Sequence, residues 1–303
     1  MSELAIIGGG PAGLTAAIYA LRAGHTVTVY EKESLGGQIT ASPLVENYPG
    51  VPGVSGAELG ARMAEQAEAL GAEIRYREVL GISRAESGFV LKTAREEDTA
   101  RAVILATGVT HRGLGLPGEE ELIGAGISFC AVCDGAFYRD GTVAVVGGGD
   151  SALQEALYLS TLCRKVCLIH RRSQFRAEER LVAKARAAAN IEMILESTPS
   201  AYLSRDGALT GLVLTHKPDG AVRELPVDGL FLAVGQTPAN AFLQDLVAMT
   251  PEGYLYSDET ALTSVPGIFA AGDCRTKEIR QLTTAVSDGA VAALAASDYL
   301  ERL

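Results

Sequence analysis

The sequence predicts an α/β protein in which one strand–helix–strand unit occurs twice, with the second copy inserted into the domain that begins with the first. Two observations lead to this fold class. A glycine-rich turn between an apolar strand and an amphipathic helix occurs at residues 8–13 and again at residues 147–152. A buried strand and a long alanine-rich helix then follow residue 267, and we expect them to complete the domain of the first turn.

Length and composition limit the class of protein. At about 150 residues per domain, a chain of 303 residues suits two domains, and 48% apolar with 21% charged residues is typical of a globular protein. The net charge of −11 disfavours nucleic acid and anionic membranes as partners. No apolar run reaches the roughly 18 residues of a membrane span, and the first strand lacks the flanking features of a signal peptide. We therefore expect a soluble, cytoplasmic protein.

The first glycine turn has the pattern of a dinucleotide-binding site. Gly8 allows the tight bend, Gly10 lets the backbone approach a diphosphate, and Gly13 lets helix and strand pack closely. Glu31, at the end of the second strand, is placed to accept hydrogen bonds from ribose hydroxyls. The elements expected here are strands at residues 4–7 and 26–30 and a helix at residues 11–23.

The second turn repeats this spacing, because Gly147 to His170 spans 23 residues, as Gly8 to Glu31 does. The end of the second strand differs between the units, because the first unit has the acid Glu31 there and the second has His170 followed by arginines. A cluster of donors suits a 2′-phosphate and predicts NADP(H), although a solvated basic patch is the alternative. The two units together predict two Rossmann-like three-layer dinucleotide-binding domains. The residues and elements concerned are Gly147, Gly149 and Ala152 in the turn, Arg171, Arg172 and Arg176 after it, strands at 143–146 and 166–169, and a helix that ends near residue 162.

Turn-rich segments at residues 109–117 and 235–240 bracket the second unit, and we interpret them as linkers. The strand at residues 267–273 ends in Asp273, whose carboxylate suits a ribityl or phosphate contact, or alternatively caps a helix. The alanine-rich helix is expected at residues 281–300. Further short strands are expected at residues 89–93, 102–106, 209–215 and 230–234.

Cys130 and Cys133 form a C-x-x-C pair ahead of the second turn. A zinc site would need a second pair, and Cys163 and Cys167 fall at a helix end and inside a strand, where we expect them in the core. Inert buried thiols are a second interpretation. A redox dithiol is favoured, because the two sulfurs lie within one helical turn and a helix N-terminus stabilises a thiolate. Asp134 then suits proton exchange, or alternatively is a helix-end carboxylate.

Several motifs, taken in order, resemble those of the low-molecular-weight thioredoxin reductases, class II pyridine nucleotide-disulfide oxidoreductases. The resemblance covers essentially the whole chain. It implies that the first unit binds FAD, that the second binds NADPH, and that the subunits form a homodimer. It also implies an FAD-binding domain made of residues 1–112 and 237–303, with an NADPH-binding domain of residues 113–236 inserted. The motifs are the glycine turn of residues 8–13, Gly36-Gly37-Gln38, Cys130-x-x-Cys133-Asp134-Gly135, His170-Arg171-Arg172-x-x-x-Arg176 and Phe269-Ala270-Ala271-Gly272-Asp273.

The same resemblance implies roles for individual residues. Cys133 would be the sulfur that faces the flavin, Cys130 the nucleophile that attacks the partner disulfide, and Asp134 the acid–base group. The residues implied for FAD are Gly8, Gly10, Pro11, Ala12, Gly13, Glu31, Lys32, Gly37, Gln38, Asn47, Thr107, Gly108, Asp273, Arg280, Gln281 and Leu282. Those implied for NADPH are Gly147, Gly149, Asp150, Ser151, Ala152, His170, Arg171, Arg172 and Arg176.

The activity implied is reduction of a thioredoxin disulfide by NADPH, through FAD and the Cys130–Cys133 pair, with rotation of one domain about the two linkers. Peroxidase-linked, glutaredoxin-like or small-molecule disulfides are alternative acceptors. An NADPH–flavin reductase without thiol chemistry and a non-enzymatic nucleotide- or zinc-binding module are further alternatives. The chain departs from some relatives near the partner-facing edge, where Ala136 precedes Phe137-Tyr138 and residues 124–126 carry no basic side chain. These departures leave the identity of the partner open.

Overall fold

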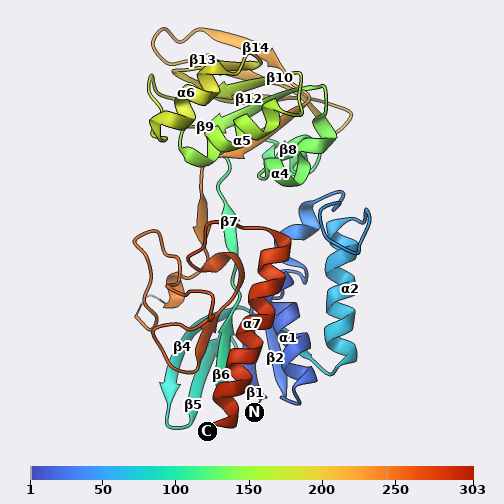
Figure 1. Ribbon diagram of the computed structural model, residues 1–303, viewed down its shortest axis with the longest axis vertical. Helices are drawn as coiled ribbons and strands as arrows, with labels where there is room; N and C mark the ends of the chain where they lie inside the picture. The colour runs from blue at the N-terminus through green and yellow to red at the C-terminus, as the bar shows by residue number, and fades with distance from the viewer. Residues whose placement is uncertain (1, 244) are drawn as a thin grey trace. The chain divides into compact units, whose positions relative to one another are not determined.

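A computed structural model describes residues 2–243 and 245–303 (Figure 1). The chain forms two compact units. The first, here called unit 1, combines Met1–Thr110 with Thr237–Leu303, and the second, unit 2, is His111–Gln236. Unit 1 is therefore interrupted in sequence by unit 2.

Unit 1 is built on a sheet in the order β3-β2-β1-β6, all parallel. The two halves of β6 have different neighbours, because its C-terminal half pairs with the parallel strand β17 and its N-terminal half with the antiparallel hairpin β5–β4. The strands are β1 Ser2–Ile7, β2 Val27–Glu31, β3 Glu73–Tyr76, β4 Val79–Ala85, β5 Gly88–Thr93, β6 Glu97–Leu105 and β17 Ile268–Ala270.

Helices α1 (Pro11–Arg22), α2 (Gly56–Ala69) and α7 (Leu282–Glu301) cover one face of this sheet. Figure 1 shows α1 and α7 side by side, and small side chains such as Ala292 and Ala296 make this close packing possible. Pro11 supplies the first residue of α1, where its missing N–H costs no hydrogen bond. The β4–β5 hairpin and the segment that contains Leu243, Val247 and Leu255 cover the opposite face.

Unit 2 contains a second parallel sheet in the order β11-β10-β9-β15-β8. Helices α5 and α6 pack on one face, and the antiparallel meander β12–β13–β14 packs on the other. The elements are β8 Ile127–Ser128, β9 Thr142–Gly147, α5 Asp150–Ser160, β10 Lys165–Ile169, α6 Glu179–Ala187, β11 Ile191–Ile194, β12 Ser197–Arg205, β13 Ala208–His216, β14 Val222–Pro226 and β15 Gly229–Ala233. Two short helices, α3 Glu119–Leu122 and α4 Ala131–Asp134, lie in the segment that leads to β9.

Two strands carry the chain between the units. β7 (Val109–His111) pairs with β16 (Gln236–Pro238) in a two-stranded sheet. The unit 2 end of this ribbon is fixed by the His111 ring, which stacks on Phe129 at 4.7 Å between centroids and lies 3.3 Å from Gln236 Nε2. Burial lowers the pKa of His111 to about 4, so the ring is neutral at physiological pH.

The cysteines outside the C-x-x-C pair lie in the hydrophobic core, as the sequence predicts. Cys163 packs on the face of the unit 2 sheet that α5 covers, and Cys167 packs on the face that the meander covers. The two sulfurs are therefore on opposite faces of one sheet. Within residues 2–243 and 245–303, no group of His, Cys, Asp or Glu side chains is arranged to hold a metal ion. No helix of these residues is long and apolar enough to cross a bilayer.

Candidate functional site

Cys130 and Cys133 form a disulfide in unit 2, with their Cα atoms 5.3 Å apart. Strand β8 ends at Ser128, and Cys130 is the residue that caps the N-terminus of α4. The backbone N–H of Cys133 points to the Cys130 sulfur, at 3.2 Å. When the bond is reduced, the same N–H would stabilise negative charge on Cys130 in preference to Cys133. This asymmetry favours Cys130 as the attacking sulfur.

Asp134 follows the disulfide and is partly buried. Its Oδ2 accepts a hydrogen bond of 2.6 Å from Ser128 Oγ, while its Oδ1 is buried and has no hydrogen-bond partner among the residues that the structure describes. Burial raises the pKa of the Asp134 carboxyl, and the Ser128 hydrogen bond opposes that rise. Ser128 Oγ also accepts a hydrogen bond from Cys130 N–H at 3.1 Å. Ser128 therefore connects the carboxyl to the redox loop, a role that sequence spacing alone did not indicate.

The three glycines of the first turn have different reasons to be glycine. Gly8 has a φ of +111° and a Cβ there would overlap the Ala106 carbonyl, while a Cβ at Gly13 would overlap the Gly8 carbonyl. Gly10 has an ordinary φ of −77°, and the nearest atom to a Cβ there would be 3.9 Å away. The protein itself therefore requires Gly8 and Gly13 but leaves space at Gly10. A diphosphate at the N-terminus of α1 fits that space.

The second turn shows the same division. A Cβ at Gly147 would lie 2.6 Å from the Ala233 carbonyl oxygen, whereas a Cβ at Gly149 would meet nothing within 4 Å. Gly149 precedes α5 as Gly10 precedes α1, and Ala152 stands where the first turn has Gly13. The equivalent open positions fit a second diphosphate.

The remaining FAD residues implied by the resemblance come from several segments of unit 1. Glu31 is 8% exposed and its two carboxylate oxygens accept hydrogen bonds from the N–H groups of Gly9 at 2.7 Å and Glu33 at 2.8 Å. Gln38 donates to the Val109 carbonyl. Lys32 and Asn47, in contrast, are exposed, and Lys32 Nζ lies 3.2 Å from a Glu33 carboxylate oxygen.

Asp273 lies just beyond the end of β17, and its Oδ1 is buried without a hydrogen-bond partner in the described part of the chain. Burial raises the pKa of this carboxyl, and the positive charges of Lys277 and Arg280 oppose the rise. An unsatisfied buried oxygen is costly unless a ligand supplies a donor, and a ribityl hydroxyl is a donor of the right kind. The Asp273 environment therefore fits FAD.

A buried carboxylate on α7 fixes the position of this strand end. Asp288 Oδ2 accepts a hydrogen bond of 2.9 Å from Gly272 N–H and lies 2.9 Å from Lys277 Nζ, and its Oδ1 lies 2.8 Å from Arg275 Nη2. Asp288 and Arg275 are 9% and 8% exposed. Breaking such a buried pair costs about 3–5 kcal/mol, so Asp288 joins the Gly272-Asp273 turn firmly to the helix.

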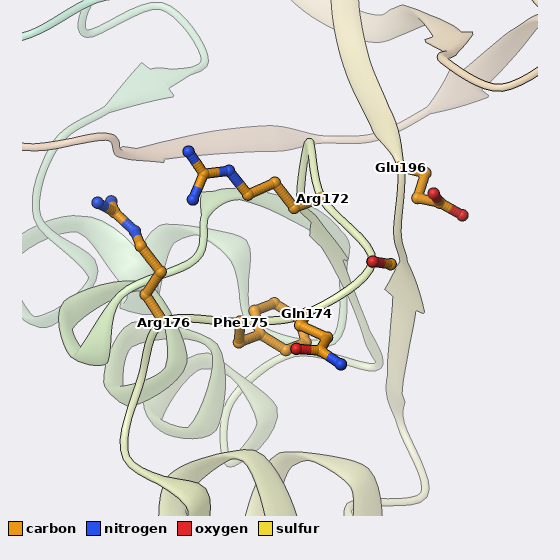
Figure 2. A pocket seen from close by; sticks show the side chains of 6 residues that line it. Arg172, Gln174, Phe175, Arg176 and Glu196 are labelled. Carbon is orange, nitrogen blue, oxygen red and sulfur yellow. The ribbon is translucent and has the colours of Figure 1, made fainter.

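In unit 2, a surface hollow of about 480 Å³ is lined by the segment after β10. Figure 2 shows Arg172 and Arg176 extending in the same direction, while Glu196 points away from them. Two guanidinium groups on one side of a hollow suit a phosphate, because each can donate more than one charge-assisted hydrogen bond.

His170 holds this segment in place. Its side chain is 5% exposed, its Nε2 lies 3.0 Å from the Gln174 carbonyl oxygen, and its ring stacks on Phe175 at 5.1 Å. A Cβ at Gly148 would overlap the imidazole ring, so Gly148 is required by the packing of His170. Desolvation lowers the pKa of His170, which favours the neutral ring. Its ring nitrogen thus contacts the loop that bears the arginines.

Glu155 on α5 is a further titratable group that the sequence did not single out. Its Oε2 is buried and has no hydrogen-bond partner within residues 2–243 and 245–303, and burial raises the pKa of the carboxyl from 4.5 to about 7. The folded state therefore keeps a proton on Glu155 that the unfolded state releases above pH 4.5. The contribution of this bound proton to the free energy of unfolding is fully present below pH 4.5 and is lost as the pH rises through about 7.

We expect Glu155→Gln to raise the free energy of unfolding by about 2–3 kcal/mol at pH 8 and to change it little at pH 4, because glutamine stays neutral at both. Urea denaturation at the two pH values measures the difference. Glu224→Gln, at an exposed position on β14, is the matched control and should show no such dependence. A gain of equal size at both pH values would contradict the assignment.

Comparison with known proteins identifies the family of this chain. The family model described as pyridine nucleotide-disulphide oxidoreductase matches residues 2–289. A thioredoxin reductase of Treponema pallidum is 42% identical over 302 residues, which are 99% of this chain and 98% of the relative. The crystal structure of thioredoxin reductase from Streptococcus pyogenes MGAS5005 matches with a TM-score of 0.96 at 40% identity and covers 100% of this chain and 99% of its own.

The Lactococcus lactis thioredoxin reductase in its FR conformation also covers 100% of both chains at 40% identity, with a TM-score of 0.69. Full-length matches at this level of identity show common descent along the whole chain. The chain therefore belongs to the pyridine nucleotide-disulphide oxidoreductase family and, within it, to the thioredoxin reductases.

Proposed function

We propose that this chain is an NADPH-dependent flavoenzyme that reduces the disulfide of thioredoxin, or of a thioredoxin-like protein, through FAD and the Cys130–Cys133 pair. The observation that carries the proposal is the disulfide at the N-terminus of α4, beside the Ser128–Asp134 pair and in the same unit as the arginine-lined hollow. The two glycine turns, each with an open Gly position, supply the two dinucleotide sites that this reaction needs.

FAD, when bound, supplies the carrier that passes two electrons from NADPH to the disulfide. Reduction of the Cys130–Cys133 bond takes up two electrons and two protons and leaves two thiols. The Cys130 thiolate attacks one sulfur of the partner disulfide, so the partner bond breaks and a mixed disulfide forms. The Cys133 thiolate then attacks Cys130, which restores the bond and releases the reduced partner. Each departing partner sulfur takes up a proton.

Asp134 is the acid–base group in this proposal. Its backbone N–H donates to the Cys130 carbonyl at 3.1 Å, so the carboxyl belongs to the same short turn as both sulfurs. Because burial raises the pKa of Asp134, the carboxyl holds a proton more readily than an exposed aspartate does. It can give that proton to a departing thiolate and recover it when the next thiol ionises.

The domain assignment follows from the motifs. We assign FAD to residues 1–112 with 237–303 and NADPH to residues 113–236, with β7 and β16 as the two strands of a hinge. Relatives of equal identity match this chain at TM-scores of 0.96 and 0.69, so those two relatives differ from one another in overall arrangement. Such a difference is expected if the NADPH domain rotates between the two half-reactions.

The partner surface is proposed around the disulfide. Val132 lies between the two cysteines and Phe137 follows them, and these side chains are 51% and 41% exposed; apolar surface beside the disulfide suits a protein partner. A homodimer and a cytoplasmic location complete the proposal. The location agrees with free thiols at Cys163, Cys167 and Cys274, which fit a reducing compartment.

The proposal is tested by anaerobic titration of the yellow protein with NADPH in the presence of several thioredoxins, with thiols counted after each addition. We expect one thioredoxin disulfide to be reduced for each NADPH consumed, and the flavin absorbance to stay bleached only after the oxidised thioredoxin has been used up. Bleaching without reduction of any thioredoxin would refute the proposed acceptor. In that case a glutaredoxin or a small-molecule disulfide is the next acceptor to add. A protein that binds no FAD would refute the flavoenzyme itself.

The glycine turns supply a separate prediction about the cofactors. Gly10→Ala should weaken FAD binding, and Gly149→Ala should raise the KM for NADPH, each by about tenfold or more, because the new methyl group occupies the space of a diphosphate. Since a Cβ at Gly10 would come no nearer than 3.9 Å to another described atom and one at Gly149 would meet no described atom within 4 Å, the stability of the ligand-free protein should change by less than about 1 kcal/mol. FAD titration, NADPH kinetics and urea denaturation measure the three quantities. An equal loss of stability and affinity would contradict the interpretation.

A further inference from the structure

Arg280 is held in one orientation by its neighbours in unit 1. Its guanidinium carbon lies over the ring of Tyr254, 4.4 Å from the centroid. Its Nε lies 3.3 Å from the Asp273 carbonyl oxygen, and its Nη2 lies 3.4 Å from the Arg275 carbonyl oxygen. The two carbonyls contact the edge of the guanidinium and the aromatic ring covers one of its faces. An arginine side chain otherwise loses much rotamer entropy when it is fixed, so these contacts keep its charge in one place beforehand.

Tyr254 is itself held by a tight turn. Its backbone carbonyl accepts a hydrogen bond of 2.8 Å from Thr250 N–H, and Gly253 N–H donates to the Thr250 carbonyl at 2.9 Å. Asn240 joins this turn to the segment of Cys274, because its Nδ2 donates to the Gly253 carbonyl and to the Cys274 carbonyl, each at 2.9 Å. Asn240 is fully buried. These hydrogen bonds therefore hold in place the backbone that carries the Tyr254 ring.

A second observation places a ligand near this arginine. Asp273, whose carbonyl accepts the Arg280 hydrogen bond, has a buried carboxylate oxygen with no partner among the described residues. The hydrogen bonds that the structure gives Arg280 go to carbonyls rather than to a carboxylate, so its positive charge is not neutralised by a direct ion pair in the described part of the chain. A fixed cation that makes no direct ion pair within the described residues, beside an unsatisfied acceptor, is suited to a ligand with both polar and electron-rich groups, as FAD is.

We propose that Tyr254 is a positioning residue for FAD, and that it acts by holding the Arg280 guanidinium in its binding orientation. This inference rests on the proposed function, because it takes FAD as the ligand of unit 1. It assigns a role to a residue that none of the sequence motifs contains. Tyr254 contacts one face of the Arg280 guanidinium, so its effect on FAD passes through the arginine.

The test is a double-mutant cycle that measures the dissociation constant of FAD from the deflavinated full-length protein. Tyr254→Leu should weaken FAD binding by about tenfold, the size expected when a partly buried cation–π contact is lost. Tyr254→Phe should stay within about twofold of the parent, because the phenyl face also attracts the cation. Tyr256→Leu is the matched control, since Tyr256 is 51% exposed and lies two residues further on.

The cycle separates positioning from a general structural role. Arg280→Met should weaken FAD binding, and adding Tyr254→Leu to it should weaken binding no further, because the group that Tyr254 positions is already gone. Additive losses, or parent affinity in Tyr254→Leu, would overturn the inference. Urea denaturation of each ligand-free variant identifies any loss that arises from unfolding. If the parent itself binds no FAD, the proposed function fails rather than this inference.

Discussion

Replacing Cys133 with serine is expected to reduce NADPH-dependent turnover with a protein disulfide by at least about 1,000-fold, because no second sulfur remains to break the mixed disulfide. Bleaching of the flavin by NADPH should persist, since Cys133 takes no part in that half-reaction. The variant should instead stop after one attack. The Cys130 thiolate should attack the sulfur of a single-cysteine thioredoxin activated with thionitrobenzoate, release the thionitrobenzoate anion into solution and leave a stable mixed disulfide with the thioredoxin.

Cys130→Ser provides the complementary result. It should be equally inactive in turnover, but it should trap little partner, because the sulfur that the Cys133 N–H stabilises has been removed. Cys163→Ala, in the core of unit 2, is the matched control and should retain turnover. Mass spectrometry of the trapped complexes distinguishes the two variants. Efficient trapping by Cys130→Ser and none by Cys133→Ser would reverse the roles assigned to the two sulfurs.

The second large effect is expected at the arginines of unit 2. Removal of both guanidinium groups in Arg172→Ala/Arg176→Ala should raise the KM for NADPH by about 100-fold or more, because each charge-assisted hydrogen bond to a phosphate contributes about 1.5–3 kcal/mol. The KM for NADH should change little, since NADH has no 2′-phosphate. The preference between the two coenzymes, measured as a ratio of kcat/KM values, should therefore collapse.

Arg180→Ala is the matched control for charge. Its side chain is 73% exposed and pairs with Glu178 outside the hollow, so the coenzyme preference should be unchanged. The dependence of the NADPH KM on salt should also weaken in the double variant, because fewer charges contact the phosphate. Equal loss of activity with NADPH and NADH would show that the arginines support the fold of the loop rather than the phosphate.

The sequence predicted the elements whose signals are local. The spacing of Gly8 and Gly147 to their strand ends located the central strands and first helices of both units, and those strands and helices were placed to within a few residues. The helices α2 and α6 and the third-layer meander β12–β14 were not predicted as such. The turn-rich linkers were recognised, but pairing of β7 with β16 joins segments more than 120 residues apart and leaves no local pattern.

The same limit applies to the site. Spacing revealed Cys130, Cys133, the glycine turns and the arginine cluster, because each is a short motif. Asn240 was missed because its partner Thr107 is 133 residues away, and the 2.6 Å hydrogen bond between them exists only in the fold. Ser128 belongs to none of the motifs, and the hydrogen bond from its hydroxyl to Asp134 exists only in the fold. Contacts between distant segments, rather than residue types, define these supporting roles.

The paired glycine turns also bear on how a two-coenzyme enzyme can arise. Gly10 and Gly149 leave the same kind of space, while the residues that we propose to distinguish the nucleotides stand at the far end of the next strand, at Glu31 and after His170. Under this assignment, binding of the diphosphate and selection of the coenzyme depend on different residues, which can change independently. After duplication of the strand–helix–strand unit, one copy can keep its glycine turn and change only the residues at the end of its second strand. Under the same assignment, a change of coenzyme in this protein would need only a few substitutions, all at the end of one strand.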